Sequence, residues 1–372
     1  MIANKYKIYR SKNNKKLEEL CNTAASIWNH TVLLSKRYYS LYGKSVPKKR
    51  MRQQISKLRK NNSYWKQLNS QSVQEVVDRV YDSYKRFFKG LAKRPPKLKK
   101  WRHFKSFVFT QSGYKIKDNR FTINGILTVK ISKSREYYDV RNIRIKRDAV
   151  GDWWLIITSS KSINDNNYTK SHNGASVGFD FSLPKFLIGS DGDNYKTPLF
   201  YYEMEEKISK LNKELSSKKR GAKNRSKKRK ELARAYRKLA NKRRDFQWKL
   251  AHKLCKQYDF IAIEDLNIDT MKKLWGKKVS DLSFSEFVKK LEHVATKYDV
   301  TIQKIDRWFA SSKTCYDCGE KNTKLQLSDR EWTCKSCGTV HDRDKNASKN
   351  ILRQGIVEYK SKCKTSNEKQ LA

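Results

Sequence analysis

Residues 315–347 read CYDCGEKNTKLQLSDREWTCKSCGTVHDRDKNA. Two CxxC pairs, Cys315 with Cys318 and Cys334 with Cys337, are separated by 15 residues, a spacing typical of four thiolates that hold one tetrahedral zinc ion in a ribbon. Four thiolates leave no open coordination position, so this zinc is predicted to be structural. Acidic residues follow at once, with Asp344 among them. Their position indicates that the ribbon, predicted over residues 311–340, is docked onto an acidic site.

The composition indicates a partner for the chain. Its 372 residues include 85 Lys and Arg against 37 Asp and Glu, a formal net charge of +48. A charge this large predicts a polyanionic partner, and nucleic acid is the most common one. With 37% hydrophobic residues the chain can still build packed cores, so it is not a disordered basic tail. We find no apolar run of membrane length and no leader peptide, and expect a soluble intracellular protein with no membrane partner.

Hydrophobic periodicity divides the first half of the chain. Apolar residues at helical spacing predict a helical unit over residues 13–94, which ends at Pro95 and Pro96. Short β-branched and aromatic runs between glycine turns predict antiparallel strands over 95–163. Together with residues 1–12 these strands are expected to form a small β-barrel that carries the helical unit as an insertion. A polar stretch over 164–175 is the predicted linker.

The second half has the element order of an RNase H-like domain. Strands are expected at 176–180, 186–189 and 197–202, then two helices near 203–217 and 225–257. A strand at 259–264, a helix at 284–297, a strand at 300–305 and a helix at 343–353 follow. The domain therefore comprises 176–310 and 341–354, with the ribbon inserted, in an α+β multidomain fold. Residues 355–372 are expected to be a disordered basic tail.

Three acidic residues occupy equivalent places in this domain. Asp180 and Glu264 each end a buried strand, on the same face as Gly178 and Ala262, and Asp344 opens a helix. Taken alone, each is more often a turn or capping residue. Three converging carboxylates in so basic a chain predict a metal site instead. Phosphodiester hydrolysis uses two divalent ions about 3.5–4 Å apart on oxygen ligands, and Mg²⁺ suits such ligands.

A basic segment lies between the two helices of the second half. Nine of its 13 residues are basic, and we expect them to contact nucleic-acid phosphates rather than to form only a solvated hinge. They are Lys218, Lys219, Arg220, Lys223, Arg225, Lys227, Lys228, Arg229 and Lys230.

These motifs together resemble one family. The stretches that carry the resemblance are Val177–Asp180, Asn241–Phe246, Ile261–Leu266, Ser311–Gly319, Leu327–Cys334 and His341–Ile351. They resemble the TnpB family, RNA-guided nucleases encoded by small bacterial and archaeal insertion sequences. The resemblance extends over essentially the whole chain, whose first half is similar to the family's wedge and recognition domains.

The resemblance implies a RuvC-like nuclease with catalytic carboxylates at Asp180, Glu264 and Asp344. It also implies a guide RNA from the transposon end and a double-stranded DNA target beside a short motif, in the cytoplasm or nucleoid of a prokaryote, as monomer or dimer. Candidate motif readers are Gln71, Gln74 and Gln111. Ser182 stands where many members have glycine, and its side chain is expected to crowd the site or tilt the turn.

Three other interpretations stay open. A compact type V CRISPR effector would share the fold, the zinc and the acids but take its RNA from a repeat array. An RNA-guided DNA-binding regulator would bind without cleavage, although the three acids argue against it. A DNA-strand transposase is less favoured, because RNase H-like transposases do not generally need this ribbon.

Overall fold

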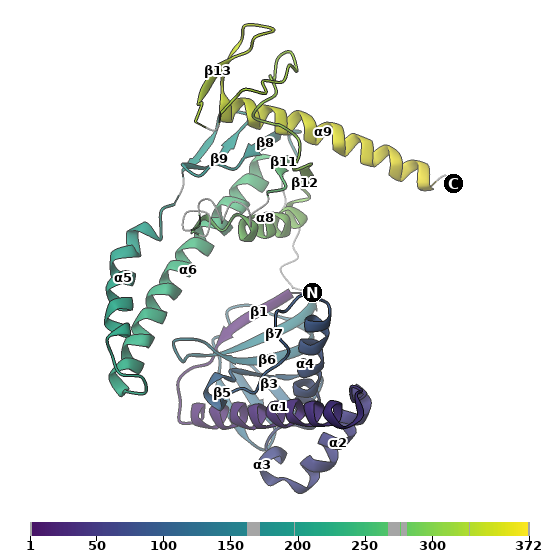
Figure 1. The fold of residues 1–372 in the computed structure, drawn as a ribbon, viewed down its shortest axis with the longest axis vertical. Helices are drawn as coiled ribbons and strands as arrows, with labels where there is room; N and C mark the ends of the chain where they lie inside the picture. Colours follow the sequence, from purple (N-terminus) through teal and green to yellow (C-terminus); the bar gives the residue numbers. More distant parts are fainter. Residues whose placement is uncertain are drawn as a thin grey trace. The chain divides into compact units, whose positions relative to one another are not determined.

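The computed structural model describes residues 2–161, 172–196, 198–266, 276, 281–326 and 328–370. The chain divides into two compact units, Met1–Asp165 and Asn166–Ala372 (Figure 1). The division falls at the predicted linker, of which residues 164–171 lie outside the described ranges. None of the helices in the described ranges is both long enough and apolar enough to cross a membrane.

The first unit has a helical part, most of which lies within residues 13–94. It comprises α1 (Asn14–Tyr42), α2 (Lys48–Asn61), α3 (Ser63–Lys66), α4 (Ser70–Phe88) and the 3₁₀ helix η1 (Trp101–His103). Helix α1 buries Leu17, Leu20 and Ala24, and α4 buries Val73 and Val77, so the helices share one core with the neighbouring strands. The apolar spacing of 3 and 4 residues produces these buried faces.

The strands of the first unit form two sheets. The longer sheet has the order β1 (Ile2–Lys7), β7 (Trp153–Lys161), β6 (Tyr138–Arg147) and β2 (Ser106–Phe109), all antiparallel. The second is an antiparallel meander of β3 (Tyr114–Lys117), β4 (Arg120–Ile123) and β5 (Leu127–Lys130).

The predicted β-barrel is therefore wrong as a closed structure. Among the described residues the two sheets are joined by a single isolated bridge between Ile8 and Ile131. A barrel needs continuous pairing around its circumference. Each strand of the meander has only four residues, whereas β6 has ten. The sheets instead share a hydrophobic core through residues such as Phe109 and Phe121, whose ring centroids are 6.2 Å apart.

The second unit contains the predicted mixed sheet. Its order is β10 (Asn194–Lys196), β9 (Lys185–Gly189), β8 (Ser176–Asp180), β11 (Phe260–Glu264) and β12 (Thr301–Ile305). Strands β8, β11 and β12 are parallel, and β9 and β10 are antiparallel to their neighbours. The third strand was predicted over 197–202 but lies at Asn194–Lys196, because Tyr195 pairs with Leu187 whereas Pro198 has no N–H to donate.

Helices cover both faces of this sheet. On one face, α6 (Lys223–Gln257) and α8 (Phe284–Tyr298) pack on Val177, Phe179 and Ile261. On the other face lies α9 (Arg343–Gln370), which packs on β8, β11 and β12 (Figure 1). Helix α5 (Tyr202–Ser216) pairs with the N-terminal half of α6 through a small core of its own. The strand parity read from the sequence therefore sets which residues face which helices.

The predicted disordered tail is also wrong, because α9 continues to Gln370. Tyr359 contacts the ring of Phe260 at 5.5 Å between centroids, and Glu358 accepts hydrogen bonds from Gln303 Nε2 and the Asp306 amide, each at 3.2 Å. Lys362 Nζ donates to Gln303 Oε1 at 3.2 Å. These contacts with the sheet extend the helix past the point at which its apolar periodicity fades.

Candidate functional site

Asp180 and Glu264 lie side by side at one edge of the sheet of the second unit. The parallel register of β8 and β11 pairs Phe179 with Ile263, so the next residues, Asp180 and Glu264, end neighbouring strands. The carboxyl ends of parallel strands are the usual position of functional groups in open sheets. The structure therefore brings the first two predicted acids together.

Helix α9 brings the third acid to them. A Cβ atom at Gly178 would lie 2.4 Å from the Ser348 carbonyl oxygen and 2.5 Å from the Leu352 nitrogen, so the helix backbone rests directly on this glycine. Asp180 is two residues further along the same strand face, and Asp344 is one helical turn before Ser348. The close crossing at Gly178 therefore aims the N-terminal turn of α9 at the Asp180 carboxylate.

The three acids interact electrostatically. The pKa of Asp180 is raised well above its ordinary value, first by burial and then by the Glu264 and Asp344 carboxylates, while Arg343 lowers it. The ionised form of Asp180 is poorly stabilised, because it is shielded from water and lies near the negative charges of Glu264 and Asp344. A cation at this position would reverse that penalty.

Glu264 has a partner that the sequence did not indicate. Ser311 Oγ donates a hydrogen bond of 2.5 Å to Glu264 Oε1. Burial raises the pKa of Glu264, and the Ser311 hydrogen bond opposes this by favouring the ionised form. Ser311 lies at the start of the predicted ribbon, 47 positions after Glu264. No local spacing rule could have paired them, because the contact depends on the path of the chain after β12.

The three carboxylates are more widely spaced than the ligands of a single small ion. Within the described ranges, three or more possible ligand atoms lie within 4.8 Å of one another only around the cysteines. Ligands of two ions about 3.5–4 Å apart are distributed around both, so a wider arrangement suits such a pair. Asp344 Oδ2 also lies 4.0 Å from the guanidinium of Arg330, which comes from the ribbon.

Ser182 does not strain the turn after β8. Its side chain is buried, and its amide donates to the Phe186 carbonyl oxygen at 3.4 Å. Its φ angle is not positive, so the backbone at this position does not require glycine.

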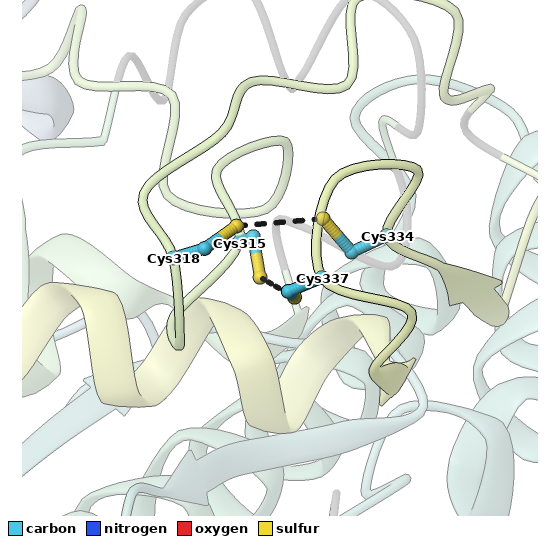
Figure 2. Close-up of side chains that lie close together, drawn as sticks. All are labelled: Cys315, Cys318, Cys334 and Cys337. Carbon is cyan, nitrogen blue, oxygen red and sulfur yellow. Dashed lines mark hydrogen bonds between the residues drawn. The ribbon is translucent and has the colours of Figure 1, made fainter.

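The four predicted cysteine ligands converge in the ribbon (Figure 2). Cys315 Sγ is 3.7 Å from Cys337 Sγ, and Cys318 Sγ is 3.5 Å from Cys334 Sγ. These distances exclude disulfide bonds, which are about 2.05 Å long. Thiolates about 2.3 Å from a tetrahedral zinc would be about 3.8 Å apart. The cluster could therefore hold a zinc ion.

A histidine that was not predicted as a ligand adjoins the cluster. His341 Nε2 lies 3.1 Å from Cys315 Sγ, and its ring packs on Trp332 with centroids 4.8 Å apart. The two residues pair directly across the hairpin of β13 (Glu331–Thr333) and β14 (Val340–Asp342). A nitrogen in this position can donate a hydrogen bond to a thiolate, as groups around metal ligands commonly do.

Two buried asparagines attach the ribbon to α9. Asn346 Nδ2 donates to the Thr314 carbonyl at 2.8 Å, and its Oδ1 accepts from the Tyr316 amide at 2.9 Å. Asn350 Nδ2 donates to the carbonyls of Ser311 and Thr314, at 2.9 and 2.6 Å. The carbonyl of Ser311 is thus fixed by the helix that carries Asp344, while its hydroxyl contacts Glu264. The cysteine cluster and the carboxylates form one connected structure.

The basic segment lies at the turn between α5 and α6 and on the first turns of α6. Arg225 donates to the carbonyls of Leu215 and Lys218, and Lys228 forms ion pairs with Glu214 and Glu231, so these two residues stabilise the helical hairpin. Six of the others have exposed side chains available to a polyanion. They are Lys219, Arg220, Lys223, Lys227, Arg229 and Lys230.

The three glutamines lie in the first unit, where α4 meets the end of β2. Gln71 Oε1 accepts hydrogen bonds from the amides of Gln111 and Ser112, each at 3.0 Å, and from Thr110 Oγ1 at 3.2 Å. Gln71 therefore holds the turn that carries Gln111. Gln74 and Gln111 are exposed. The three predicted motif readers lie together, on the first two turns of α4 and on the turn after β2.

Two family models and several known proteins match parts of the chain. Residues 159–274 match the family model OrfB_IS605, described as "Probable transposase", and residues 284–351 match "Cas12f1-like, TNB domain". A "Putative RNA-guided DNA endonuclease" of Streptomyces pristinaespiralis is 28% identical over 309 residues, which are 79% of this chain and 74% of that protein. "TnpB-like protein L79" of Acanthamoeba polyphaga mimivirus is 32% identical over 42% of this chain and 32% of its own length.

A solved structure shares the fold. The protein in a "Cryo-EM structure of the Cas12f1-sgRNA-target DNA complex" matches with a TM-score of 0.57 and 15% identity, over 92% of this chain and 83% of that one. The resemblance to the TnpB family is thus confirmed by sequence, and the Cas12f1-like fold by structure.

Proposed function

We propose that this relative of the TnpB-like proteins is an RNA-guided DNA endonuclease of an insertion sequence that cuts double-stranded DNA beside a short adjacent motif. The convergence of Asp180, Glu264 and Asp344 at the edge of an RNase H-like sheet carries the proposal. The Streptomyces relative, which is named as an RNA-guided DNA endonuclease, supports it. The net charge of +48 suits a chain that holds a guide RNA, an RNA–DNA hybrid and a flanking duplex.

In this proposal Asp180, Glu264 and Asp344 would hold two Mg²⁺ ions. Such a metal pair would supply activation of water and stabilisation of the leaving oxygen. Burial and the two neighbouring acids destabilise the ionised Asp180, and this favours uptake of cations there. The Ser311 hydroxyl orients Glu264 and favours its ionised form, against the effect of burial on its pKa. The exposed basic side chains near the α5–α6 turn would contact phosphates, and Gln71, Gln74 and Gln111 would read the adjacent motif.

Substitution of the carboxylates tests the nuclease assignment. In Asp180→Ala or Glu264→Ala, cleavage of a matched target in Mg²⁺ should fall to background while guided binding persists, because binding uses the basic surfaces. Gel assays of cleavage and of binding on the same preparations would measure both. Full cleavage by either variant would refute the site.

We further propose that Cys315, Cys318, Cys334 and Cys337 hold one structural Zn²⁺. Elemental analysis of the purified chain should give about one zinc per molecule, and Cys318→Ser should lose it, because a tetrahedral thiolate site needs all four ligands. Cys363→Ser is the matched control, since this exposed cysteine lies outside the cluster. Full zinc content in Cys318→Ser would contradict the ligand set.

A compact type V CRISPR effector is the second candidate, favoured by the Cas12f1-like fold. The RNA that copurifies with the chain separates the two: a scaffold that overlaps the 3′ end of the gene supports the transposon nuclease, and repeat-derived RNA supports the CRISPR effector. Guided binding without strand scission in Mg²⁺ would instead identify an RNA-guided DNA-binding regulator.

A further inference from the structure

Trp308 is the most exposed large hydrophobic side chain among the described residues, at 85%. It belongs to the loop Asp306–Ser311, which follows β12 in the second unit. The carboxylates and the cysteines do not account for this side chain. An indole left in water without a partner forgoes the stabilisation that burial of apolar surface provides.

The loop leaves the sheet at the edge where the carboxylates lie. Strand β12 runs parallel to β11, with Ile305 paired to Glu264, so Asp306 begins the loop beside the tip of β11. Asp180 ends the next strand in the same order. The loop ends at Ser311, which donates its hydroxyl hydrogen to Glu264. Trp308 therefore lies on a short segment connected to the candidate centre at both ends.

Internal contacts fix the backbone of this loop. Asp306 Oδ1 accepts from the Trp308 amide at 2.7 Å, and the Asp306 carbonyl accepts from the Phe309 amide at 3.1 Å. Arg307 pairs with Asp265 in the segment after β11. Phe309 packs inward on the cluster of Ala262, Ile305 and Ile351. With its neighbours held in this way, the loop presents the Trp308 indole outward.

An exposed aromatic plane on a fixed backbone suits a nucleobase. Each base of an unpaired strand offers a flat face, whereas bases in a duplex cover one another. A chain with a net charge of +48 attracts polyanions rather than apolar partners. Both ends of the loop lie at the edge of the sheet that carries the carboxylates, which favours the strand whose phosphate is to be cut.

We propose that Trp308 is a stacking platform for an unpaired base of the DNA strand, and that it positions the scissile phosphate at the carboxylates. This inference rests on the proposed nuclease function. Trp308 is a positioning residue in this account, because the reacting atoms meet the carboxylates and not the indole.

Two readouts on the full chain, purified with its own RNA, test the proposal. The first uses a short single-stranded oligodeoxynucleotide with one 2-aminopurine, a base whose fluorescence is quenched on stacking, moved position by position. It is bound to the chain in the Asp180→Ala background to prevent cleavage. One position should be quenched, and Trp308→Ala should restore its fluorescence. The second is the rate of cleavage of a matched target, which should fall roughly 5- to 150-fold in Trp308→Ala through loss of one stacked base.

Two conservative variants separate stacking from bulk. Trp308→Phe keeps an aromatic face and should retain most quenching and cleavage, whereas Trp308→Leu keeps apolar volume without that face and should resemble the alanine variant. Equal melting temperatures would show that the variants remain folded. If leucine behaves as tryptophan, Trp308 acts by apolar packing and the proposal is overturned.

The outcomes distinguish this inference from the function on which it rests. If the wild type cleaves and no Trp308 variant changes the cleavage rate, the stacking role of Trp308 is overturned and the nuclease function stands. A wild type that does not cleave but shows Trp308-dependent quenching overturns the nuclease and retains a single-strand binding site. Absence of both cleavage and Trp308-dependent quenching overturns both.

Discussion

Glu264 depends on a serine that belongs to another part of the sequence. The Ser311 hydroxyl contacts its carboxylate at 2.5 Å, and the Ser311 carbonyl is held by Asn350 of α9 at 2.9 Å. The backbone contact would survive loss of the hydroxyl. The hydroxyl can therefore be removed without releasing the loop, which makes Ser311 a clean site for substitution.

We predict that Ser311→Ala lowers kcat about 10- to 150-fold, because a hydrogen bond to a charged group contributes about 1.5–3 kcal/mol. The Ser311 hydrogen bond lowers the pKa of Glu264, so its loss raises that pKa. The ionised carboxylate then forms only at higher pH, and the acid limb of the rate profile should move upward. Steady-state cleavage across pH measures both effects.

Ser312→Ala is the matched control, because it removes a hydroxyl from the next residue. Within the described ranges the hydrogen bond to Glu264 comes from Ser311 and not from Ser312. It should leave both kcat and the pH profile unchanged. An unchanged kcat in Ser311→Ala would show that the contact with Glu264 does not matter for catalysis.

At the scale of elements, the crossing of α9 over the sheet decides where Asp344 lies. Two glycines permit it: Gly178 on β8, whose added Cβ would meet Ser348 and Leu352 backbone atoms, and Gly355 on α9, whose added Cβ would lie 2.6 Å from Ala262 Cβ. Backbone atoms cannot move aside as the end of a flexible side chain can, so a side chain at Gly178 must displace the helix.

We predict that Gly178→Ala reduces cleavage severely and lowers the free energy of unfolding by about 1–3 kcal/mol, the usual range for an overpacked core. Displacement of α9 would carry Asp344 away from Asp180. Thermal or denaturant unfolding and cleavage assays would measure the two effects.

Gly192→Ala supplies the comparison. Gly192 has a φ of +94° and no atom within 4 Å of an added Cβ, so this variant adds backbone strain in the turn between β9 and β10 without disturbing α9. It should lose stability but keep its cleavage rate per folded molecule. If Gly178→Ala also keeps full cleavage, the close approach of helix and sheet is not needed for the site.

In the molecule as a whole, the basic residues outnumber those that the fold uses in internal contacts. The hairpin of α5 and α6 uses Arg225 and Lys228 internally, whereas Lys219, Arg220 and Lys223 at its turn are exposed. Residues of the second kind are available for phosphate contacts, which release counterions from the nucleic acid. The two kinds can be told apart by the dependence of binding on salt.

We predict that replacing Lys219, Arg220 and Lys223 with Gln weakens nucleic-acid binding and reduces the slope of log affinity against log salt by about 2–3, close to one for each lost phosphate contact. Filter binding over a range of salt concentrations gives the slope. Stability should not change, because none of the three side chains contributes to the hairpin core.

The same number of charges can be removed from the ribbon for comparison, at the exposed Lys321, Lys324 and Lys335. A smaller change of slope in this control would assign phosphate contacts to the hairpin turn. Equal changes would mean that both sets act only through net charge.

Local features of this protein could be predicted from its sequence. The CxxC spacing identified Cys315, Cys318, Cys334 and Cys337 as a cluster, because such ligands lie on tight turns whose geometry is local. Alternation in β8 and β11 assigned Asp180 and Glu264 to strand ends and to one face, because strand parity depends only on the neighbouring residues. The element order of the second unit followed from the same periodicities.

Features that depend on contacts between distant residues became visible in the folded chain alone. Three such features join segments far apart in the chain. Ser311 pairs with Glu264, the backbone of α9 packs directly on Gly178, and α9 extends past residue 354. The open sheets of the first unit likewise depend on which strand edges meet, which no single strand encodes. The physical reason is common to all: periodicity fixes the direction of a side chain within its own element, whereas its partner is set by how elements pack.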